Sequence, residues 1–352
     1  MSLAHLTVSH LRCIRSAELE IAPRLSLFYG GNGSGKTSLL EAIFLLGRGR
    51  SFRTRNTERL IERGEHGLRV TGEVTRLAAP VRLVFEATRA ESVSASVSGR
   101  AVESLAELSE IFPVQVIEPG VHRLIEEGGY RRRRWLDWAV FHVEPQFVDR
   151  WQRYRRALRQ RNAALRSRSA QAESWDSELA RLGEEIGNSR RHLIGELEPY
   201  WRPIVRALSS LDVELGYLPG WAEGTLLEAL KASRARDELR QTTHAGPHRA
   251  DVTIRVHGRP AREVLSRGQQ KLVAAAMNLA QLALLRESHG IAPTLLLDDP
   301  SAELDRERLG AFIEEIGKLE SQLVLTSLHA ESSLFGAPER VFHVEHGEVQ
   351  PL

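Results

Sequence analysis

Residues 30–37 read Gly30-Gly31-Asn32-Gly33-Ser34-Gly35-Lys36-Thr37 and fit the phosphate-binding pattern G-x-x-x-x-G-K-[ST], called Walker A. The apolar run at residues 25–29 predicts a buried strand before the glycines, and residues 38–46 predict a helix after them. This pattern requires a strand, a glycine loop and a helix in that order. The alternative is a plain glycine-rich turn, but a chance match is improbable in a chain with only four lysines.

The residue types in this loop suit nucleotide phosphates. Glycines let backbone N–H groups converge on phosphate oxygens, and the helix N-terminus adds positive potential. We expect the Lys36 ammonium to reach the β- and γ-phosphates and the Thr37 hydroxyl to bind Mg²⁺. The predicted cofactors are therefore ATP and Mg²⁺.

A second apolar run, Thr294-Leu295-Leu296-Leu297-Asp298-Asp299, ends in two carboxylates and has the Walker B form. A buried parallel strand would bring Asp298 beside the glycine loop, where it can hold Mg²⁺ through water. Asp299 would then orient the attacking water. The alternative is an Asp-Asp-Pro turn at the end of a strand.

The segment Leu265-Ser266-Arg267-Gly268-Gln269-Gln270 matches the L-S-x-G-Q signature of ABC-type ATPases and precedes an apolar helical run. In that class the signature meets ATP bound to the other subunit. The resemblance therefore implies an ATP-dependent homodimer, with Ser266 and Gly268 acting at the γ-phosphate and Gln269 close to the nucleotide. The alternative is a serine that simply caps a helix.

Weaker matches accompany these motifs. Gln115 ends an apolar run and is a candidate γ-phosphate sensor, although a strand-edge glutamine would look the same. Residues 301–305 resemble the D-loop that follows Walker B. Asp299 replaces the glutamate common at this place in ABC-type ATPases, a change that we expect to slow hydrolysis without preventing nucleotide binding.

The domain organisation follows from the spacing of the motifs. About 230 residues separate Gly35 from Leu265, which is more than a compact nucleotide-binding domain needs. We therefore predict an α/β ABC-type, SMC-like P-loop ATPase head over residues 1–115 and 246–352, with a helical, arginine-rich lobe inserted at 116–245. An apolar stripe from Leu179 to Leu197 predicts one helix of this lobe, closed by Pro199 and Pro203.

Charge is nearly balanced overall but concentrated locally. The 352 residues hold 48 Lys and Arg against 46 Asp and Glu, a net charge of +2. Residues 121–168 alone contain 13 arginines and five acids. Arginine interleaved with aromatic residues suits DNA phosphates and exposed bases, whereas a solvated, salt-bridged helix face is the alternative. The candidate DNA contacts are Arg131, Arg132, Arg133, Arg153 and Arg156.

Together these motifs resemble the RecF family of bacterial recombination-mediator ATPases, which are related to SMC proteins. Residues 128–138, 159–165 and 246–251 also match family segments, and Gly129 stands where the family usually has proline. The resemblance runs from the first strand to the D-loop. It implies weak, DNA-stimulated ATP hydrolysis, binding to single-stranded DNA, duplex DNA and gap junctions, and action with RecR and RecO. Through these it implies RecA loading at gaps, replication-fork recovery and SOS induction.

Other functions and locations remain to be weighed against this one. An ABC transporter ATPase subunit and an SMC-like structural scaffold are the competing functions, and the long insert argues against the transporter. The single cysteine excludes an internal disulfide. The sequence has neither the apolar run of a signal peptide nor a membrane-spanning stretch. We therefore expect a cytoplasmic, nucleoid-associated protein.

Overall fold

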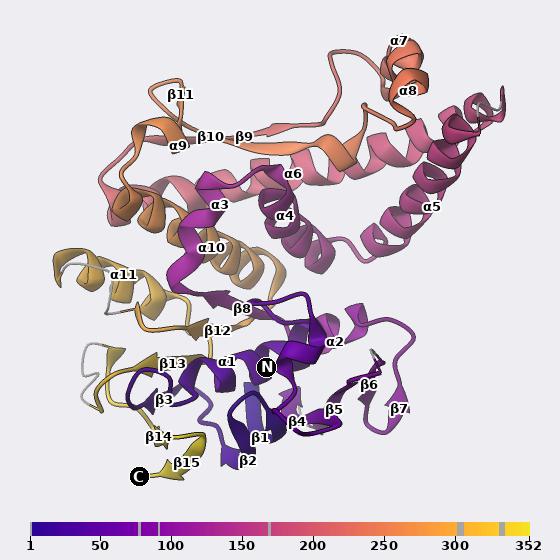
Figure 1. Cartoon of the computed structure of the whole chain (residues 1–352). Helices are drawn as coiled ribbons and strands as arrows, with labels where there is room; N and C mark the ends of the chain where they lie inside the picture. Colours follow the sequence, from indigo (N-terminus) through magenta and orange to yellow (C-terminus); the bar gives the residue numbers. More distant parts are fainter. Residues whose placement is uncertain (1, 77–78, 91, 168–169, 301–305, 331–334) are drawn as a thin grey trace. The chain divides into compact units, whose positions relative to one another are not determined.

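The computed structural model describes residues 2–76, 79–90, 92–167, 170–300, 306–330 and 335–352. The chain divides into two compact units (Figure 1): unit 1 comprises Met1–Val121 and Leu285–Leu352, and unit 2 comprises His122–Leu284. Unit 2 therefore extends to Leu284, whereas the sequence led us to place the end of the insert at residue 245. The reason is a pairing between distant segments, because β10 (Asp251–Val256) is antiparallel to β9 (Val213–Leu218) in unit 2.

Unit 1 is built on a six-stranded sheet in the order β15-β14-β3-β13-β12-β8. Its pairs are parallel except β14–β15. Because parallel strands are covered on both faces, they read as continuous apolar runs, as β12 does. The strands are β3 (Leu25–Tyr29), β8 (Val114–Ile117), β12 (Thr294–Leu297), β13 (Leu323–Ser327), β14 (Arg340–Glu345) and β15 (Glu348–Pro351).

A second, antiparallel sheet completes unit 1, in the order β2-β1-β4-β5-β6-β7. Helix α1 (Lys36–Arg48) shares one hydrophobic core with both sheets, and most of its residues are buried. The sheet strands are β1 (Ser2–Leu11), β2 (Ile14–Glu20), β4 (Gly67–Arg76), β5 (Ala79–Thr88), β6 (Val93–Val97) and β7 (Arg100–Ala101). The remaining elements are η1 (Thr57–Leu60), α2 (Ala106–Ile111) and α11 (Arg306–Lys318).

Unit 2 packs long helices against a small sheet in the order β11-β10-β9. Its long helices are α4 (Gly129–Val143), α5 (Phe147–Arg166), α6 (Asp176–Ser209) and α10 (Arg267–His289), the last of which continues into unit 1. The short elements are η2 (Pro119–His122, at the junction of the units), α3 (Arg123–Glu126), η3 (Ala170–Trp175), α7 (Leu226–Ala232), α8 (Arg234–Arg240), η4 (Pro247–Arg249), β11 (Arg259–Pro260) and α9 (Ala261–Val264).

Helix α6 does not end at Pro199 and Pro203, where the sequence led us to expect its end. It continues through Pro199 and Pro203 to Ser209. Each proline removes a backbone donor, but the apolar stripe continues on the far side of both. Trp201 is fully buried, and its indole N–H donates to the Val213 carbonyl oxygen at 2.8 Å. Packing of this second half therefore outweighs the local cost of the prolines.

Candidate nucleotide site

The Walker A residues form the turn between β3 and α1, as their order predicts. Gly30 and Gly35 have φ angles of 153° and 121°, in the region that favours glycine. A Cβ atom on Gly30 would lie 2.1 Å from the Val344 carbonyl oxygen, and one on Gly35 would lie 2.8 Å from Ile14 Cδ1. These two glycines are therefore required by backbone conformation and by close packing.

The neighbouring hairpin also holds this loop in place. The N–H of Gly347, in the turn between β14 and β15, donates to the Ser34 carbonyl oxygen at 2.9 Å. The Ser34 hydroxyl is buried and has no hydrogen-bond partner in the described part of the chain. An unsatisfied buried hydroxyl is costly unless a ligand pairs with it. The loop thus contains a polar atom that a phosphate oxygen would satisfy.

Lys36 lies over the same loop. Its ammonium donates to the carbonyl oxygens of Gly30 at 2.7 Å and Gly31 at 2.8 Å. Burial lowers the pKa of the Lys36 ammonium, while the negative charges of Asp299 and Asp298 act in the opposite direction. The structure thus brings the Walker A lysine and both Walker B carboxylates into one electrostatic environment.

The Walker B carboxylate meets the Walker A hydroxyl. Thr37 Oγ1 donates to Asp298, at 2.9 Å from Oδ1 and 3.1 Å from Oδ2. Thr326, on β13, donates its hydroxyl to Asp298 Oδ1 at 2.9 Å and accepts the Asp299 N–H at 2.9 Å. Hydroxyl and carboxylate oxygens are the ligands that Mg²⁺ prefers. The donor set of Thr37 and Asp298 therefore fits this ion.

Thr326 and Glu41 were absent from the sequence-based site. Glu41, on α1, is fully buried and accepts hydrogen bonds from Arg12 and from the Ser51 hydroxyl. Its carboxylate also lies 3.8 Å from Arg53 in the loop after α1. In the sequence, Glu41 is marked only as an acid in the predicted helix, four positions after Thr37, and Thr326 only by its place at the end of a strand.

Gln115 is part of β8 and is buried. Its side-chain carbonyl accepts a hydrogen bond from Arg48 at 3.1 Å. The structure therefore ties this candidate sensor to the C-terminal end of α1.

The signature segment lies in unit 2 at the start of α10. Gln269 Oε1 accepts the Ser266 N–H at 3.0 Å, and the Ser266 hydroxyl accepts the Gln269 N–H at 3.3 Å. This reciprocal pair is a capping box, so the helix-cap reading of Ser266 is correct at the local level. Ser266 and Gly268 are both exposed, and a Cβ on Gly268 would meet no atom within 4 Å. The predicted D-loop at 301–305 lies outside the described residues.

The arginine-rich window serves partly as internal structure. Arg132 makes a two-point ion pair with Asp251, with both contacts at 2.8 Å. It also donates to the carbonyl oxygens of Leu124, Ile125 and Glu127. Because its guanidinium is buried among these partners, Arg132 is less available to DNA than the exposed arginines of this window. This partly buried ion pair holds α4 against β10.

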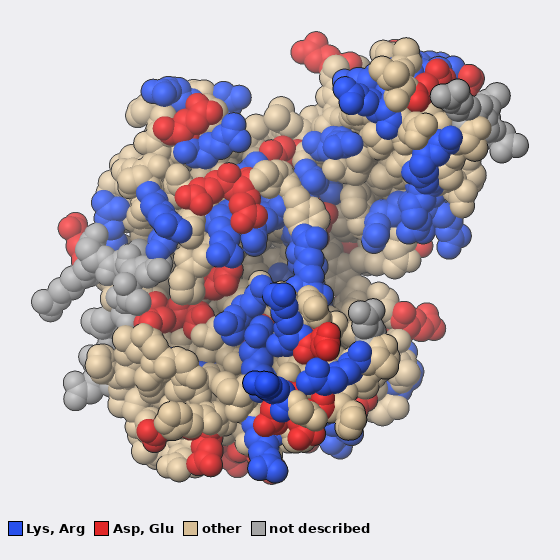
Figure 2. All heavy atoms as spheres, viewed as in Figure 1, with Lys and Arg blue, Asp and Glu red and all other residues tan. Residues whose placement is uncertain are grey.

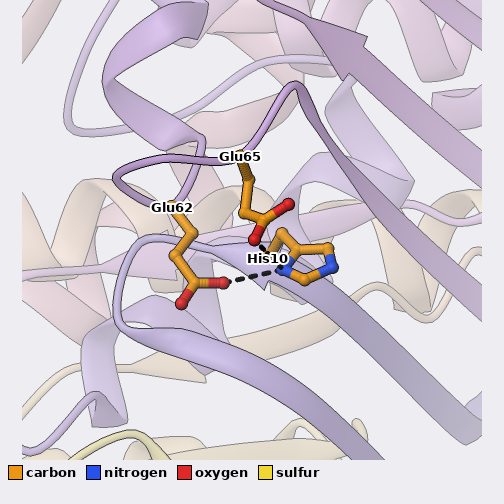
Figure 3. Close-up of side chains that lie close together, drawn as sticks. All are labelled: His10, Glu62 and Glu65. Carbon is orange, nitrogen blue, oxygen red and sulfur yellow. Dashed lines mark hydrogen bonds and ion pairs between the residues drawn. The ribbon is translucent and has the colours of Figure 1, made fainter.

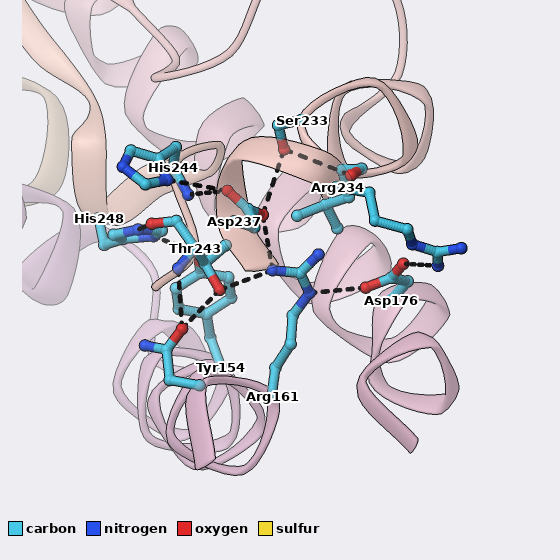
Figure 4. Close-up of polar contacts among 11 residues, drawn as sticks. Tyr154, Arg161, Asp176, Ser233, Arg234, Asp237, Thr243, His244 and His248 are labelled. Carbon is cyan, nitrogen blue, oxygen red and sulfur yellow. Dashed lines mark hydrogen bonds and ion pairs between the residues drawn. The ribbon is translucent and has the colours of Figure 1, made fainter. Parts of the chain in front are cut away.

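A larger polar cluster lies between α5, α6 and α8 (Figure 4). Arg161 is fully buried and donates to Asp176 at 2.7 Å and to Asp237 at 2.8 Å. His248 Nδ1 lies 2.7 Å from the Tyr154 hydroxyl. Burial lowers the pKa of His248 to about 4, so this imidazole is neutral near pH 7. Thr243 links the two groups, because its hydroxyl accepts from Arg161 at 2.8 Å and its carbonyl oxygen lies 3.1 Å from His248 Nε2. Residues 159–165 and 246–251 therefore belong to one structural network.

The other candidate DNA contacts are more accessible. Arg131 pairs with Glu127 through one helical turn, and Arg153 pairs with Glu178 at 2.9 Å. Arg133 is half-buried and donates to the Ala250 carbonyl oxygen at 2.6 Å. Arg156 is exposed on α5. The five arginines that the sequence suggested as DNA contacts therefore differ in how accessible they are to DNA.

Two further features of the described residues bear on function. His10 Nδ1 lies 2.7 Å from Glu62 and 4.0 Å from Glu65 (Figure 3), which among the described residues is the group with the potential to hold a metal ion. One close contact and partial exposure are typical of a surface histidine–glutamate pair, and we assign it no ion. None of the described helices combines the length and apolar character needed to cross a bilayer.

Comparison with known proteins places these features in a family. Residues 2–349 match the RecF/RecN/SMC N terminal domain. A protein of Pseudomonas aeruginosa (strain LESB58) named DNA replication and repair protein RecF is 40% identical over 360 residues, covering 99% of this chain and 97% of that protein. A protein of the same name from Shewanella baltica (strain OS155 / ATCC BAA-1091) is 36% identical over 356 residues, covering 99% of both.

Solved structures agree with this relationship. A structure described as the recombination mediator protein RecF-ATP in the RecFOR pathway superposes with a TM-score of 0.90 at 27% identity, covering 99% of this chain and 97% of that one. An Smc head bound to the C-winged helix domain of ScpA superposes with a TM-score of 0.60 at 15% identity, covering 100% and 98%. The second likeness shows a shared fold alone, and it agrees with an SMC-like α/β head.

Proposed function

The chain belongs to the RecF/RecN/SMC N terminal domain family and, within it, to RecF, and from this membership we propose that it is a recombination-mediator ATPase that clamps DNA as an ATP-dependent dimer. The observation that carries the proposal is the meeting of Thr37 with Asp298 beside the glycine loop. A relative with the same fold is described with ATP bound.

Each residue of the site has a defined task in this proposal. The loop of residues 30–37 binds the phosphates through backbone N–H groups, with Lys36 at the β- and γ-phosphates. Thr37 and Asp298 would hold Mg²⁺, which would neutralise the charge that develops on the phosphate oxygens. Asp299 orients the attacking water. Its N–H bond to Thr326 fixes the backbone from which that carboxylate projects.

The signature completes the site from a second subunit. Ser266 and Gly268 are exposed at the start of a capped helix, where amide groups and positive potential face outward. They approach the γ-phosphate of ATP bound to the partner subunit. ATP binding therefore favours the dimer, and hydrolysis releases it.

DNA is the proposed binding partner of this ATP-dependent dimer. The exposed arginines Arg153 and Arg156 of unit 2 contact DNA phosphates, and the half-buried Arg131 and Arg133 support them. With RecR and RecO, the protein helps load RecA at gaps and supports replication-fork recovery and SOS induction at the nucleoid. The relatives' description as replication and repair proteins and the RecFOR pathway of a solved relative support this assignment.

ATP hydrolysis measured without DNA, with single-stranded DNA and with gapped duplex tests the proposal. We expect slow basal turnover that rises with DNA. Light scattering should show an ATP-dependent dimer that Ser266→Arg abolishes while ATP still binds. Ser94→Arg, on the exposed face of β6, is the matched control and should dimerise normally. Unstimulated turnover at a protein concentration where DNA is bound would favour the structural scaffold instead.

A further inference from the structure

Helix α5 carries arginines in two different environments. Arg150 pairs with Glu144, Arg153 with Glu178, and Arg161 with two buried aspartates. Four others, Arg155, Arg156, Arg159 and Arg166, are exposed, and none of them has an ion pair or hydrogen bond among the described residues. Three of these four, Arg155, Arg156 and Arg159, line one hollow of the surface, and we call them the α5 arginine face.

The surface around this face is polar and hollowed. A hollow of about 300 Å³ is lined by Asp149, Gln152, Arg153, Arg155, Arg156 and Arg159. In Figure 2, Lys and Arg side chains form a continuous group over the part of the surface where Figure 1 shows α5. None of the large hydrophobic side chains exposed in the described part of the chain lies on α5.

These features distinguish between two classes of partner. A protein-binding surface normally has an apolar core inside a polar rim, which this face lacks. Guanidinium groups that are close together and unpaired repel one another in the free protein, and phosphate oxygens relieve this repulsion through two-point hydrogen bonds. The chemistry therefore favours a nucleic-acid backbone over an acidic protein.

We propose that the α5 arginine face binds the phosphate backbone of DNA, an assignment that rests on the proposed function and specifies its contact surface. Arg155 and Arg159 are one helical turn apart, a rise of about 6 Å, which corresponds to roughly two nucleotide steps along one strand. The face therefore contacts phosphates about two steps apart on one strand without reading base sequence. Arg132 and Arg161 remain internal, because their guanidinium groups are already bound to carboxylates.

The salt dependence of DNA binding tests this proposal with the full-length protein. The triple variant Arg155→Gln, Arg156→Gln, Arg159→Gln is compared with the wild type on a gapped duplex in the presence of ATP, by fluorescence anisotropy over a range of salt concentrations. Each lost phosphate contact should reduce the slope of log K against log salt by about 0.9. We expect the slope to become shallower by about 2 to 3, with similar loss on unrelated sequences.

A control variant with the same change of net charge shows whether a loss of DNA binding comes from this particular face or from the net charge of the protein. The variant Arg181→Gln, Arg202→Gln, Arg206→Gln removes three arginines of unit 2 that already pair with Glu178 or Glu185, Glu198 and Asp212. Its slope should change by less than about 1. Both variants alter surface positions, so ATP binding and thermal stability should match the wild type.

The outcomes distinguish this proposal from the function on which it rests. Equal slopes for the wild type and the α5 variant, with DNA binding intact, would overturn the α5 assignment and leave the DNA-binding function standing. Equal loss in both triple variants would also overturn it, because net charge alone would then explain binding. If the wild type binds no DNA, the proposed function and this inference fall together. Loss of binding to an acidic protein partner but not to DNA would reassign the face to that partner.

Discussion

Thr37 Oγ1 lies 2.9 Å from Asp298 Oδ1, although 261 positions separate the two residues. The sheet order explains their meeting. Strand β13 lies between β3, which precedes the glycine loop, and β12, which precedes Asp298. Because the three strands are parallel, the residues that follow them gather at one edge of the sheet. Thr326, on the middle strand, then contacts Asp298 directly.

Thr326→Val should weaken Mg²⁺-dependent nucleotide binding. The substitution keeps the shape of the side chain but removes the hydroxyl that orients Asp298 and accepts the Asp299 N–H. Loss of a residue that hydrogen-bonds to a metal ligand typically lowers metal affinity or activity by about 10- to 100-fold. A titration of a fluorescent ATP analogue at several Mg²⁺ concentrations measures the effect. Thr326→Ser keeps the hydroxyl and should behave nearly as the wild type; equal losses in both variants would refute this role.

Lys36→Arg should retain part of the ATP binding and lose most of the hydrolysis. Arginine keeps the charge, but its planar group does not reproduce the compact ammonium held over the loop by Gly30 and Gly31. Loss of one such group costs about 100- to 1000-fold in turnover. Single-turnover hydrolysis gives the value. Lys231→Arg, on the exposed side of α7, is the control, and normal turnover in Lys36→Arg would reject the site assignment.

Gly35→Ala should disrupt the loop, whereas Gly31→Ala should be tolerated. A Cβ at Gly35 would lie 2.8 Å from Ile14 Cδ1 and 3.1 Å from Cys13 Sγ, on a backbone with φ of 121°. A Cβ at Gly31 would meet nothing within 4 Å. We expect a loss of about 1–3 kcal/mol of stability for Gly35→Ala and little for Gly31→Ala. Differential scanning calorimetry compares them, and equal melting temperatures would contradict the packing described.

Unit 2 should lose stability between about pH 6.5 and pH 4. The native pKa of His248 is about 4 against 6.5 for the free side chain. The unfolded state therefore binds the proton first as pH falls, and stability is lost across this interval. Its size is roughly 3 kcal/mol. Urea unfolding followed by tryptophan fluorescence reports on unit 2, because all six tryptophans lie within it.

His248→Gln is the matched variant for this pH prediction. The amide can still interact with the Tyr154 hydroxyl or the Thr243 carbonyl oxygen, the partners of His248 at 2.7 Å and 3.1 Å, but it does not titrate. Its stability should fall less steeply than that of the wild type from pH 6.5 to pH 4. Parallel pH profiles for the two proteins would show that other groups carry the dependence.

Arg161→Met should destabilise unit 2 by about 3–5 kcal/mol. The substitution leaves the carboxylates of Asp176 and Asp237 in the interior without their shared cation, and removing one partner of a buried pair has a cost of this size. Arg153→Met breaks only an exposed pair with Glu178 and should cost about 1 kcal/mol or less. The same fluorescence unfolding assay compares the two. A similar small loss in both variants would mean that the buried cluster contributes little.

Local sequence patterns were sufficient to predict the strands, turns and helices that carry the site. The turn from β3 to α1, the apolar strand before Asp298 and the helix capped by Ser266 depend on contacts within a few positions of the chain. Spacing and residue type therefore predict them directly. The same local logic was wrong at Pro199 and Pro203, where burial on both sides of the prolines extends α6.

Tertiary structure decided the features that depend on distant partners. Thr326 belongs to the site because β13 lies between β3 and β12. Residues 246–284 belong to unit 2 because β10 pairs with β9. Above all, identical arginines divide into buried ion pairs, such as Arg132 with Asp251, and the exposed α5 arginine face. Side-chain type determines the charge, but only the folded chain determines whether a carboxylate is already beside it.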